Sequence, residues 1–414
     1  MQMLDVRLAR LRVGANRWAS LAVSRKIELL LACRDATGRV APAWTALAAA
    51  LKGVAGTPAE GEEATTGPWA VAAALNRYSA TLRRIERSGA PPLDRRAIRR
   101  RPDGQIVVGV FPEDGYDRFL LPGVRAEVWL RPKATPSVLR PDPEPRVALV
   151  LGAGNITSIG PLDALYALVA EGAACMLKLH PLLDDLAAIV EAALAPLVTE
   201  GYLTVERGDA AAGAYLSAHP LVDRVHVTGS FATYDRVVAE AGSGKRVTGE
   251  LGNVTPTIVV PDRWSDADVA AAAANIASAK LHNAGFNCVA PQVLILPARW
   301  DRRSALLSRI ERLLRDAPDR PAYYPGAAER FARLARGKAS PIVELSPDDS
   351  TEPLFREEAF CSLLAVVNLP GAPESHLERA VAFANERLAG DLAVNLIARR
   401  GARAPESDDA IAAL

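Results

Sequence analysis

The stretch Val147-Ala148-Leu149-Val150-Leu151-Gly152-Ala153-Gly154-Asn155 decides the fold that the sequence predicts. Five consecutive apolar residues indicate a strand that is buried on both faces, and the glycines that follow indicate a turn. The segment from Pro161 to Glu171 has a helical pattern, with a proline suited to its first turn. Cys175 to Leu179 is then a second apolar strand. Strand, helix and strand in this order predict a parallel sheet.

The same alternation continues downstream of this unit. A helix is predicted over 182–198, a strand over 203–206, a helix over 210–218 and a strand over 225–227. Repeated strands and helices predict an α/β fold in which helices cover both faces of a parallel sheet. Sheets of this kind bind dinucleotides beyond the carboxyl ends of their strands.

Three regions are predicted from the changes in composition along the chain. Residues 1–90, rich in Ala, Leu and Arg, form a helical N-terminal region. Residues 91–250 form a dinucleotide-binding domain with preceding strands, and residues 251–414 form an α/β catalytic domain. The remaining predicted elements are strands over 106–110, 126–130, 257–260 and 291–296, a stiff proline-rich link at 141–145, and a helix over 266–281 that Ser265 can cap.

The composition is that of an ordinary globular protein. Of the 414 residues, 50% are hydrophobic and 23% are charged, which argues against disorder. The net charge of +1 gives no overall attraction to nucleic acid or to an acidic membrane surface, and we expect neither as a partner. The basic residues Arg95, Arg96, Arg99, Arg100 and Arg101 are flanked by acidic residues, and we interpret them as a solvated face.

The four cysteines are widely separated, at Cys33, Cys175, Cys288 and Cys361, so no zinc-binding pair and no metal site is predicted. Few cysteines in a long chain suit reduced thiols in a cytosol. Residues 1–20 carry several charges, unlike a signal peptide, and no run of about 18 uncharged apolar residues suggests a membrane span. A cytoplasmic location is the expectation.

The segment Gly152-Ala153-Gly154-Asn155 is the first candidate site. A Rossmann fingerprint would need a third glycine at position 157, which is Thr157, so that fingerprint fails. The segment is then either a plain glycine turn or a turn that presents Asn155. The amide of Asn155 can donate a hydrogen bond to a carbonyl oxygen that gains negative charge.

Two further candidates are Cys288, which follows His282-Asn283-Ala284-Gly285-Phe286-Asn287, and Glu250, which lies between Gly249 and Leu251-Gly252. A lone cysteine is most often an inert buried residue, but a loop rich in Asn and Gly after a long helix can hold a thiolate nucleophile at a cleft. A lone glutamate is most often a surface residue. The alternative is a general base whose pKa is tuned by partial burial.

Several segments together resemble the aldehyde dehydrogenase superfamily. The family's Thr-Gly-Ser pattern matches Thr228-Gly229-Ser230, and its Glu-Leu-Gly-Gly-x-x-Pro pattern resembles Glu250-Leu251-Gly252-Asn253-Val254-Thr255-Pro256. Its Asn-x-Gly-Gln-x-Cys loop resembles the segment from Asn283 to Cys288, and its Glu-Glu-x-Phe segment resembles Glu357-Glu358-Ala359-Phe360. The resemblance covers roughly residues 147–400 and implies the family's fold, with a parallel-sheet dinucleotide-binding domain and an α/β catalytic domain.

The resemblance implies a role for each matched residue. Asn155 and Lys178 fit the family's oxyanion asparagine and ribose-binding lysine in order and in spacing. Cys288 would be the nucleophile, Asn155 and the backbone N–H of Cys288 would hold the oxyanion, and Glu250 would activate the deacylating water. The residues implied to contact the cofactor are Lys178 at the adenosine ribose, Gly229 and Ser230 near the pyrophosphate, Glu358 at the nicotinamide ribose and Phe360 at the nicotinamide end.

The activity implied by the resemblance is the NAD(P)-dependent oxidation of an aldehyde to a carboxylic acid. Attack by the Cys288 thiolate gives a thiohemiacetal, loss of hydride leaves a thioester, and a water polarised by Glu250 releases the acid. Two alternatives remain. One is an enzyme that forms or reduces acyl-CoA at the same cysteine, and the other is a non-catalytic family member. The activity predicts a low-pKa thiol at Cys288 that reacts faster than Cys33 or Cys175.

The sequence departs from the family's pattern at several positions. Pro181 stands where a glutamate often binds the ribose 2′-hydroxyl, so NAD and NADP both remain open as cofactors. Tyr234 stands where a glycine usually follows Thr-Gly-Ser, and Cys361-Ser362 replaces Gly-Pro. Family members continue past the region that matches 383–414, with a substrate-pocket loop and a strand that pairs with a neighbouring subunit. We therefore expect a catalytic domain that is incomplete at its C-terminus, and a homodimer only where that continuation is present.

Overall fold

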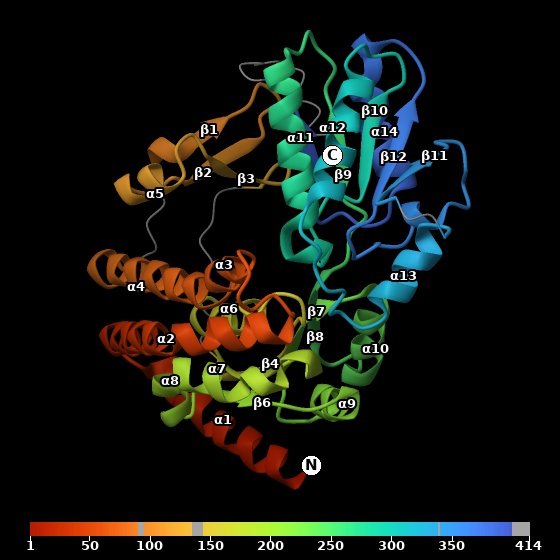
Figure 1. Ribbon diagram of the computed structural model, residues 1–414. Coiled ribbons are helices and arrows are strands. Elements are labelled where there is room, and N and C mark those ends of the chain that lie inside the picture. The colour runs from red at the N-terminus through yellow and green to blue at the C-terminus, as the bar shows by residue number, and fades with distance from the viewer. Residues whose placement is uncertain (90–94, 135–143, 338–339, 400–414) are drawn as a thin grey trace.

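The computed structural model describes residues 1–89, 95–134, 144–337 and 340–399 of the chain (Figure 1). It is an α/β structure with two parallel sheets, a small antiparallel sheet and a helical N-terminal region. The predicted fold class is therefore confirmed. The first parallel sheet and the N-terminal helices occupy the lower part of Figure 1, and the second parallel sheet occupies the upper part.

The N-terminal helices each bury one face. In the first of them, Leu8, Leu11, Ala15 and Trp18 recur at three- and four-residue spacing, and all four are at most 1% exposed. A π-helical turn at Thr65–Trp69 contains Pro68 and joins the two later helices. The four helices are α1 (Gln2–Ser20), α2 (Val23–Leu51), α3 (Glu60–Ala64) and α4 (Ala70–Ser88).

The first parallel sheet has the strand order β6-β5-β4-β7-β8, and every neighbouring pair is parallel. The strand predicted from the Val147 stretch is β4, and it lies in the middle of the sheet. The strands are β4 (Arg146–Leu151), β5 (Ala173–Lys178), β6 (Leu203–Glu206), β7 (Arg224–Gly229) and β8 (Arg246–Leu251). The helices that connect them are α6 (Ile159–Val169), α7 (Ala187–Ala193), α8 (Ala195–Thr199), α9 (Ala210–Ala218) and α10 (Phe231–Ala241).

One predicted helix is divided in the structure. The expected helix over 182–198 consists of a 3-10 segment at Pro181–Leu186, then α7, then α8. Pro196 has no backbone N–H to donate to the carbonyl oxygen of Ala192, so the helical hydrogen-bond pattern is interrupted between α7 and α8.

Strand β4 is buried on both faces, as its apolar run predicts. Val147 and Leu149 pack against α1, in a cluster with Leu8 and Leu11. Ala148 and Val150 point to the opposite face, where they join residues of α2, α4 and α6. The N-terminal helices therefore pack against both faces of the first sheet.

The second parallel sheet has the order β11-β12-β10-β9-β13. Helices α11 and α12 cover one face and α13 and α14 the other. A capping box begins α11, in which Ser265 and Asp268 exchange side-chain and backbone hydrogen bonds. The strands are β9 (Pro256–Val259), β10 (Val293–Pro297), β11 (Ile342–Leu345), β12 (Leu364–Leu369) and β13 (Asn395–Ile397), and the helices are α11 (Asp266–Leu281), α12 (Arg303–Asp316), α13 (Ala327–Leu334) and α14 (His376–Arg387).

The small antiparallel sheet corrects the interpretation of the basic cluster. It consists of β1 (Ile98–Arg100), β2 (Ile106–Phe111) and β3 (Ala126–Trp129), with α5 (Gly115–Leu120) between β2 and β3. Arg99 donates to Glu127 at 2.8 Å, and the guanidinium of Arg101 lies 4.5 Å from the ring centroid of Trp129. Arg101 is only 6% exposed, so the prediction that it lies on a solvated face is wrong. Its guanidinium packs on the indole of Trp129 in a cation–π contact, which shields it from solvent.

Some predicted features fall outside the described residues, namely Pro141 and Pro143 of the link and the chain after 399. Within the described ranges, none of the helices combines the length and the hydropathy that a membrane crossing requires.

Gly14 should be intolerant of a side chain, because α1 approaches the main chain before β6 at this residue. A Cβ on Gly14 would lie 2.0 Å from the carbonyl oxygen of Gly201. We expect Gly14→Ala to lower the stability of the protein by about 1–3 kcal/mol, although alanine favours helices more than glycine does. The unfolding temperature measured by calorimetry tests this.

Gly38 on α2 is the matched control, since it is exposed and a Cβ there would meet nothing within 4 Å. Gly38→Ala should raise stability by about 0.5–1 kcal/mol through helix propensity alone. Similar changes in unfolding temperature for the two variants would show that α1 does not press on Gly201.

Candidate functional site

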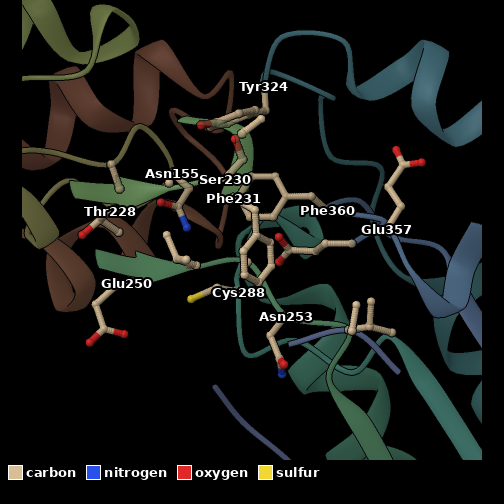
Figure 2. A pocket seen from close by; sticks show the side chains of 18 of the residues that line it. Asn155, Thr228, Ser230, Phe231, Glu250, Asn253, Cys288, Tyr324, Glu357 and Phe360 are labelled. Atoms are coloured by element: carbon tan, nitrogen blue, oxygen red, sulfur yellow. The ribbon is translucent and has the colours of Figure 1, made fainter. Parts of the chain in front are cut away.

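A cavity of about 400 Å³ lies beyond the carboxyl ends of the first sheet's strands (Figure 2). The first sheet contributes residues that follow or end β4, β7 and β8, and the second contributes residues that precede β10 and β12. Seven of the eight predicted site residues line this cavity: Asn155, Gly229, Ser230, Glu250, Cys288, Glu358 and Phe360. The structure thus brings together residues that are up to about 200 positions apart in the sequence.

Lys178 is the predicted residue that does not line the cavity. It ends β5, is 6% exposed, and its Nζ donates to the main-chain oxygen of Leu179 at 3.2 Å. Burial lowers its pKa, and Asp184 and Asp209 act in the opposite direction.

The loop before Cys288 contains three successive residues in the left-handed backbone region. Asn283, Ala284 and Gly285 have φ values of 50°, 55° and 81°. Asparagine and glycine tolerate this region, but Ala284 is strained there. A Cβ on Gly285 would lie 2.4 Å from the carbonyl oxygen of Cys361, so this glycine is also required by close packing.

Two asparagine side chains hold this loop against the end of β4. Nδ2 of Asn283 donates to the main-chain oxygens of Asn155 and Phe286, each at 2.9 Å. Nδ2 of Asn155 donates to the same Phe286 oxygen at 3.0 Å. A side-chain amide carries two N–H donors, so Asn155 retains a second one at the cavity wall.

Cys288 lies half-buried on the wall of the cavity. Burial raises the pKa of its thiol, and the carboxylates of Glu358 and Glu250 raise it further, against the lowering effect of the backbone N–H groups of Cys288 and Val289. The expected low pKa is therefore wrong, because desolvation and negative charge outweigh the N–H donors.

The two other cysteines in the comparison are less accessible than Cys288. Cys33 and Cys175 are both 0% exposed, and burial raises the pKa of Cys33 to about 12 and that of Cys175 further still. Faster reaction of Cys288 remains the prediction, now on grounds of access rather than of a low pKa.

Glu250 is exposed, so the expected partial burial of this carboxylate is wrong. The physical reason is its strand, because β8 is the edge strand of the first sheet. In Figure 2 the carboxylate of Glu250 is directed away from Cys288. An exposed side chain can change rotamer at little cost, so this orientation is not fixed.

Glu358 has its carboxylate packed against the main chain of Gly252. A Cβ on Gly252 would lie 2.5 Å from Oε2, so a side chain at this position would displace the carboxylate of Glu358. Among the described residues Oε1 has no hydrogen-bond partner, although it is buried. Burial raises the pKa of Glu358 to about 7, against the lowering effect of Lys280 and Arg330. A buried, unpaired acceptor at a cavity is suited to hydroxyl donors of a ligand.

Lys280 is a buried cation that the sequence analysis missed. It lies on α11, is 0% exposed, and its Nζ has no hydrogen-bond partner within the described part of the chain. Burial lowers its pKa to about 8, while Cys361 and Glu358 act to raise it. Its charge therefore lies close to the carboxylate of Glu358. A lysine within the alanine-rich helix 266–281 gives no sequence signal that it is buried beside Glu358, because its burial depends on tertiary packing.

The sequence analysis also missed the aromatic side chains of the cavity. Phe231 and Tyr324 line it together with Phe360, and the ring centroids of Tyr324 and Phe360 are 5.0 Å apart. In Figure 2 the ring of Phe231 projects into the space between Cys288 and Phe360. An aromatic pair before a proline and a glycine, at Tyr323-Tyr324-Pro325-Gly326, was an available signal.

Two departures from the family's pattern are accommodated locally. Tyr234 on α10 packs over β8, where a Cβ on Gly249 would lie 2.8 Å from its ring. Ser230 caps α10, since its Oγ accepts a hydrogen bond from the N–H of Thr233 at 3.2 Å. The helix thus begins at the cavity despite the missing glycine.

No group of three or more His, Cys, Asp and Glu residues within the described ranges could hold a metal ion. Nδ1 of His282, near the candidate nucleophile, lies 3.2 Å from Nδ2 of Asn287.

Comparisons with known proteins point to one family. The sequence profile of the aldehyde dehydrogenase family matches residues 155–334. A coniferyl aldehyde dehydrogenase of Pseudomonas sp. (strain HR199 / DSM 7063) is 29% identical over 257 residues, which are 59% of this chain and 50% of that protein. The chain therefore spans half the length of this curated relative.

Solved structures show the same fold. The γ-glutamyl-γ-aminobutyraldehyde dehydrogenase of Burkholderia cenocepacia J2315 matches with a TM-score of 0.70 and 19% identity, over 100% of this chain and 79% of that one. PnpE in complex with nicotinamide adenine dinucleotide matches with a TM-score of 0.67 and 20% identity, over 99% and 80%. The sequence profile, the relatives and the fold all support membership of the aldehyde dehydrogenase superfamily.

Proposed function

We propose that the protein oxidises an aldehyde to a carboxylic acid and transfers the hydride to NAD or NADP. The observation that carries this proposal is the placement of Cys288, Asn155, Glu250 and Glu358 around one cavity. Together they supply a nucleophile, an oxyanion donor, a base and a ligand acceptor. The family and its NAD-bound structural neighbour support the same activity.

The residues present fit a nicotinamide dinucleotide. Glu358 offers a buried and unpaired carboxylate oxygen, which suits a ribose hydroxyl. Gly229 and Ser230 bring the N-terminus of α10 to the cavity, where backbone N–H groups favour a phosphate. Phe231 and Phe360 offer faces for an aromatic ring. When bound, the dinucleotide supplies the acceptor for the hydride.

The reaction begins at the thiolate of Cys288, which forms a bond to the carbonyl carbon of the aldehyde. The carbonyl oxygen takes the negative charge, and the free N–H of Asn155 donates to it. Loss of the hydride from that carbon leaves a thioester on Cys288. Glu250 then takes a proton from a water whose oxygen attacks the thioester, the C–S bond breaks, and the acid leaves.

A second candidate activity is transfer of the acyl group between Cys288 and coenzyme A. The rotamer of Glu250 in Figure 2 favours it, because the carboxylate is directed away from the thiol. Hydrolysis requires one of the other rotamers that the exposure of Glu250 allows, and in such a rotamer Glu250 would favour the acid as product. Adding coenzyme A to the assay and analysing the product as acid or acyl-CoA separates the two activities.

Replacement of the two catalytic candidates should separate the two half-reactions. Cys288→Ala should abolish aldehyde oxidation, because it removes the atom that attacks the carbonyl carbon. Glu250→Gln should still give a burst of about one NADH or NADPH per site, followed by turnover slowed about 100-fold or more through loss of the general base. Stopped-flow absorbance at 340 nm with a panel of aldehydes measures both phases.

Cys175→Ala serves as the control for the loss of a thiol, since Cys175 is buried in the first sheet away from the cavity. Loss of the burst in Glu250→Gln as well would overturn the deacylating role. A wild-type protein that reduces neither cofactor with any aldehyde would refute the proposed activity.

Cofactor affinity should fall as the solution is acidified through pH 7. The ribose hydroxyls donate to the ionised carboxylate of Glu358, whose pKa is raised to about 7 in the free protein. The affinity for the cofactor is therefore at its full value above this pH. Below it, the dissociation constant should rise by up to about tenfold per pH unit. Titration of NAD and of NADP by calorimetry between pH 5.5 and 8.5 measures the effect.

Glu358→Gln should bind the cofactor about tenfold or more weakly at pH 8, because it loses a hydrogen bond to a charged group. Its affinity should not vary with pH near 7. An unchanged pH dependence in this variant would assign the titration to another group.

A further inference from the structure

The five-residue helix α3 reaches the loop of the candidate nucleophile from a distant part of the chain. Oε2 of Glu62 accepts the backbone N–H of Asn283 at 3.0 Å. The same carboxylate accepts two N–H groups of Arg320, at 2.8 and 2.7 Å. The main chain of Asn283 is thus held by a carboxylate that is itself held by a bidentate arginine.

The next residue of α3 acts on the side chain of Asn283 through Lys52. Nζ of Lys52 donates to Glu63 at 2.8 Å and to Oδ1 of Asn283 at 3.1 Å. Lys52 and Glu63 are 3% and 2% exposed. An ammonium group can only donate, so it requires the oxygen of the Asn283 amide to face it. The NH₂ of the amide then faces the other way.

The NH₂ of Asn283 is the group that fixes the two ends of the site. It donates to the main-chain oxygens of Asn155 and Phe286, which lie beside the oxyanion donor and two residues before Cys288. The hydroxyl of Tyr323 lies 3.0 Å from both the Asn155 oxygen and Oδ1 of Asn283, and donates its proton to one of them. The ring of Tyr323 packs edge-on against Phe286, with centroids 4.9 Å apart.

We propose that the Lys52–Glu63 ion pair and Tyr323 are positioning residues, which orient Asn283 so that the Asn155 donor and the Cys288 thiol meet the same carbonyl group. This proposal rests on the proposed roles of Cys288 and Asn155. The positioning residues touch neither substrate nor cofactor. Their effect is to hold a strained loop in the one geometry in which the oxyanion donor is already in place.

An ion pair with this degree of burial is poorly explained by stability alone. Desolvation of two charges offsets most of their attraction, and apolar replacements of buried pairs are often neutral or stabilising. A pair retained for positioning should be dispensable for folding and important for rate. The test therefore measures folding and acylation rate separately in the same variants.

The test compares acylation rates in variants that remain folded. Tyr323→Phe removes one hydroxyl and keeps the ring, and Lys52→Met with Glu63→Gln removes both charges together. p-Nitrophenyl acetate is the probe, because its attack by the Cys288 thiol passes through an oxyanion without needing a cofactor. The burst of p-nitrophenolate is measured above the background of Cys288→Ala, beside aldehyde oxidation.

We expect the acylation rate to fall about tenfold in Tyr323→Phe and about tenfold or more in the double variant, since misplacement by about 1 Å can cost 100-fold. The dissociation constant of NAD should stay within twofold, because none of the three residues lines the cavity. Tyr215→Phe is the matched control: it removes the tyrosine hydroxyl that donates to Asp5 on the far side of the first sheet, and should leave acylation unchanged.

Each outcome decides between the proposals. Slower acylation with unchanged cofactor affinity supports positioning, and does so even where the wild-type protein oxidises no aldehyde and the proposed function fails. Acylation of Tyr323→Phe and of the double variant within twofold of wild type overturns the positioning role. A wild-type protein that is not acylated at Cys288, either alone or with NAD bound, overturns the positioning role, whereas the proposed function is refuted separately by the absence of cofactor reduction with every aldehyde.

Discussion

The hydrogen bonds from Asn283 to the main chain of Asn155 and Phe286 are the constraint on which the rest of the site depends. They join the end of β4, in the first sheet, to the loop that enters β10, in the second sheet. Each sheet can form its own core without the other, because four separate clusters of apolar residues serve their faces. The chemistry needs both sheets at once, and polar contacts of defined direction rather than apolar packing bring the two ends together.

This arrangement explains why the loop can be strained. Three successive residues with positive φ would not hold their conformation on their own, since this backbone conformation is energetically unfavourable for Ala284. The loop is fixed from outside by Glu62 on its backbone, by Lys52 on its side chain and by the carbonyl of Cys361 packed against Gly285. The N-terminal helical region therefore does more than cover the first sheet, because Glu62 on α3 and Lys52 directly after α2 also hold this loop.

The sequence allowed much of the fold to be predicted, and the reason is the strength of its local patterns. The apolar run at Val147 and the alanine-rich helix 266–281 fix their own conformation, and both appear where they were expected. The helix over 182–198 was predicted as one piece, because the periodicity of its apolar residues continues across Pro196 while its hydrogen bonds do not. Local pattern singled out Asn155, Glu250 and Cys288, and the resemblance to the aldehyde dehydrogenase superfamily added the other four predicted residues that line the cavity.

What the sequence could not give was the environment of each side chain. Glu250 is exposed because β8 lies at a sheet edge, and strand order is a property of the whole chain. Lys52 and Lys280 carry no motif, and their burial beside the site depends on contacts between residues that are far apart in sequence. The contacts of Tyr323 depend on the same kind of packing, although its aromatic pair was a sequence signal. The prediction of a low pKa for Cys288 was wrong for the same reason. The direction of the pKa shift depends on burial and on Glu358, which is 70 positions away in the sequence.

The raised pKa of Cys288 has a consequence for how the proposed reaction would be controlled. Burial raises the pKa of the thiol, and the carboxylates of Glu358 and Glu250 raise it further, so the free protein favours the neutral thiol, which is a poor nucleophile. A ligand that places positive charge near the cavity would stabilise the thiolate, and by linkage the thiolate would bind that ligand more tightly. The oxidised nicotinamide ring carries such a charge. Under the proposed function, a cofactor with positive charge near the cavity would therefore favour the thiolate of Cys288, against the burial and the carboxylates that raise its pKa.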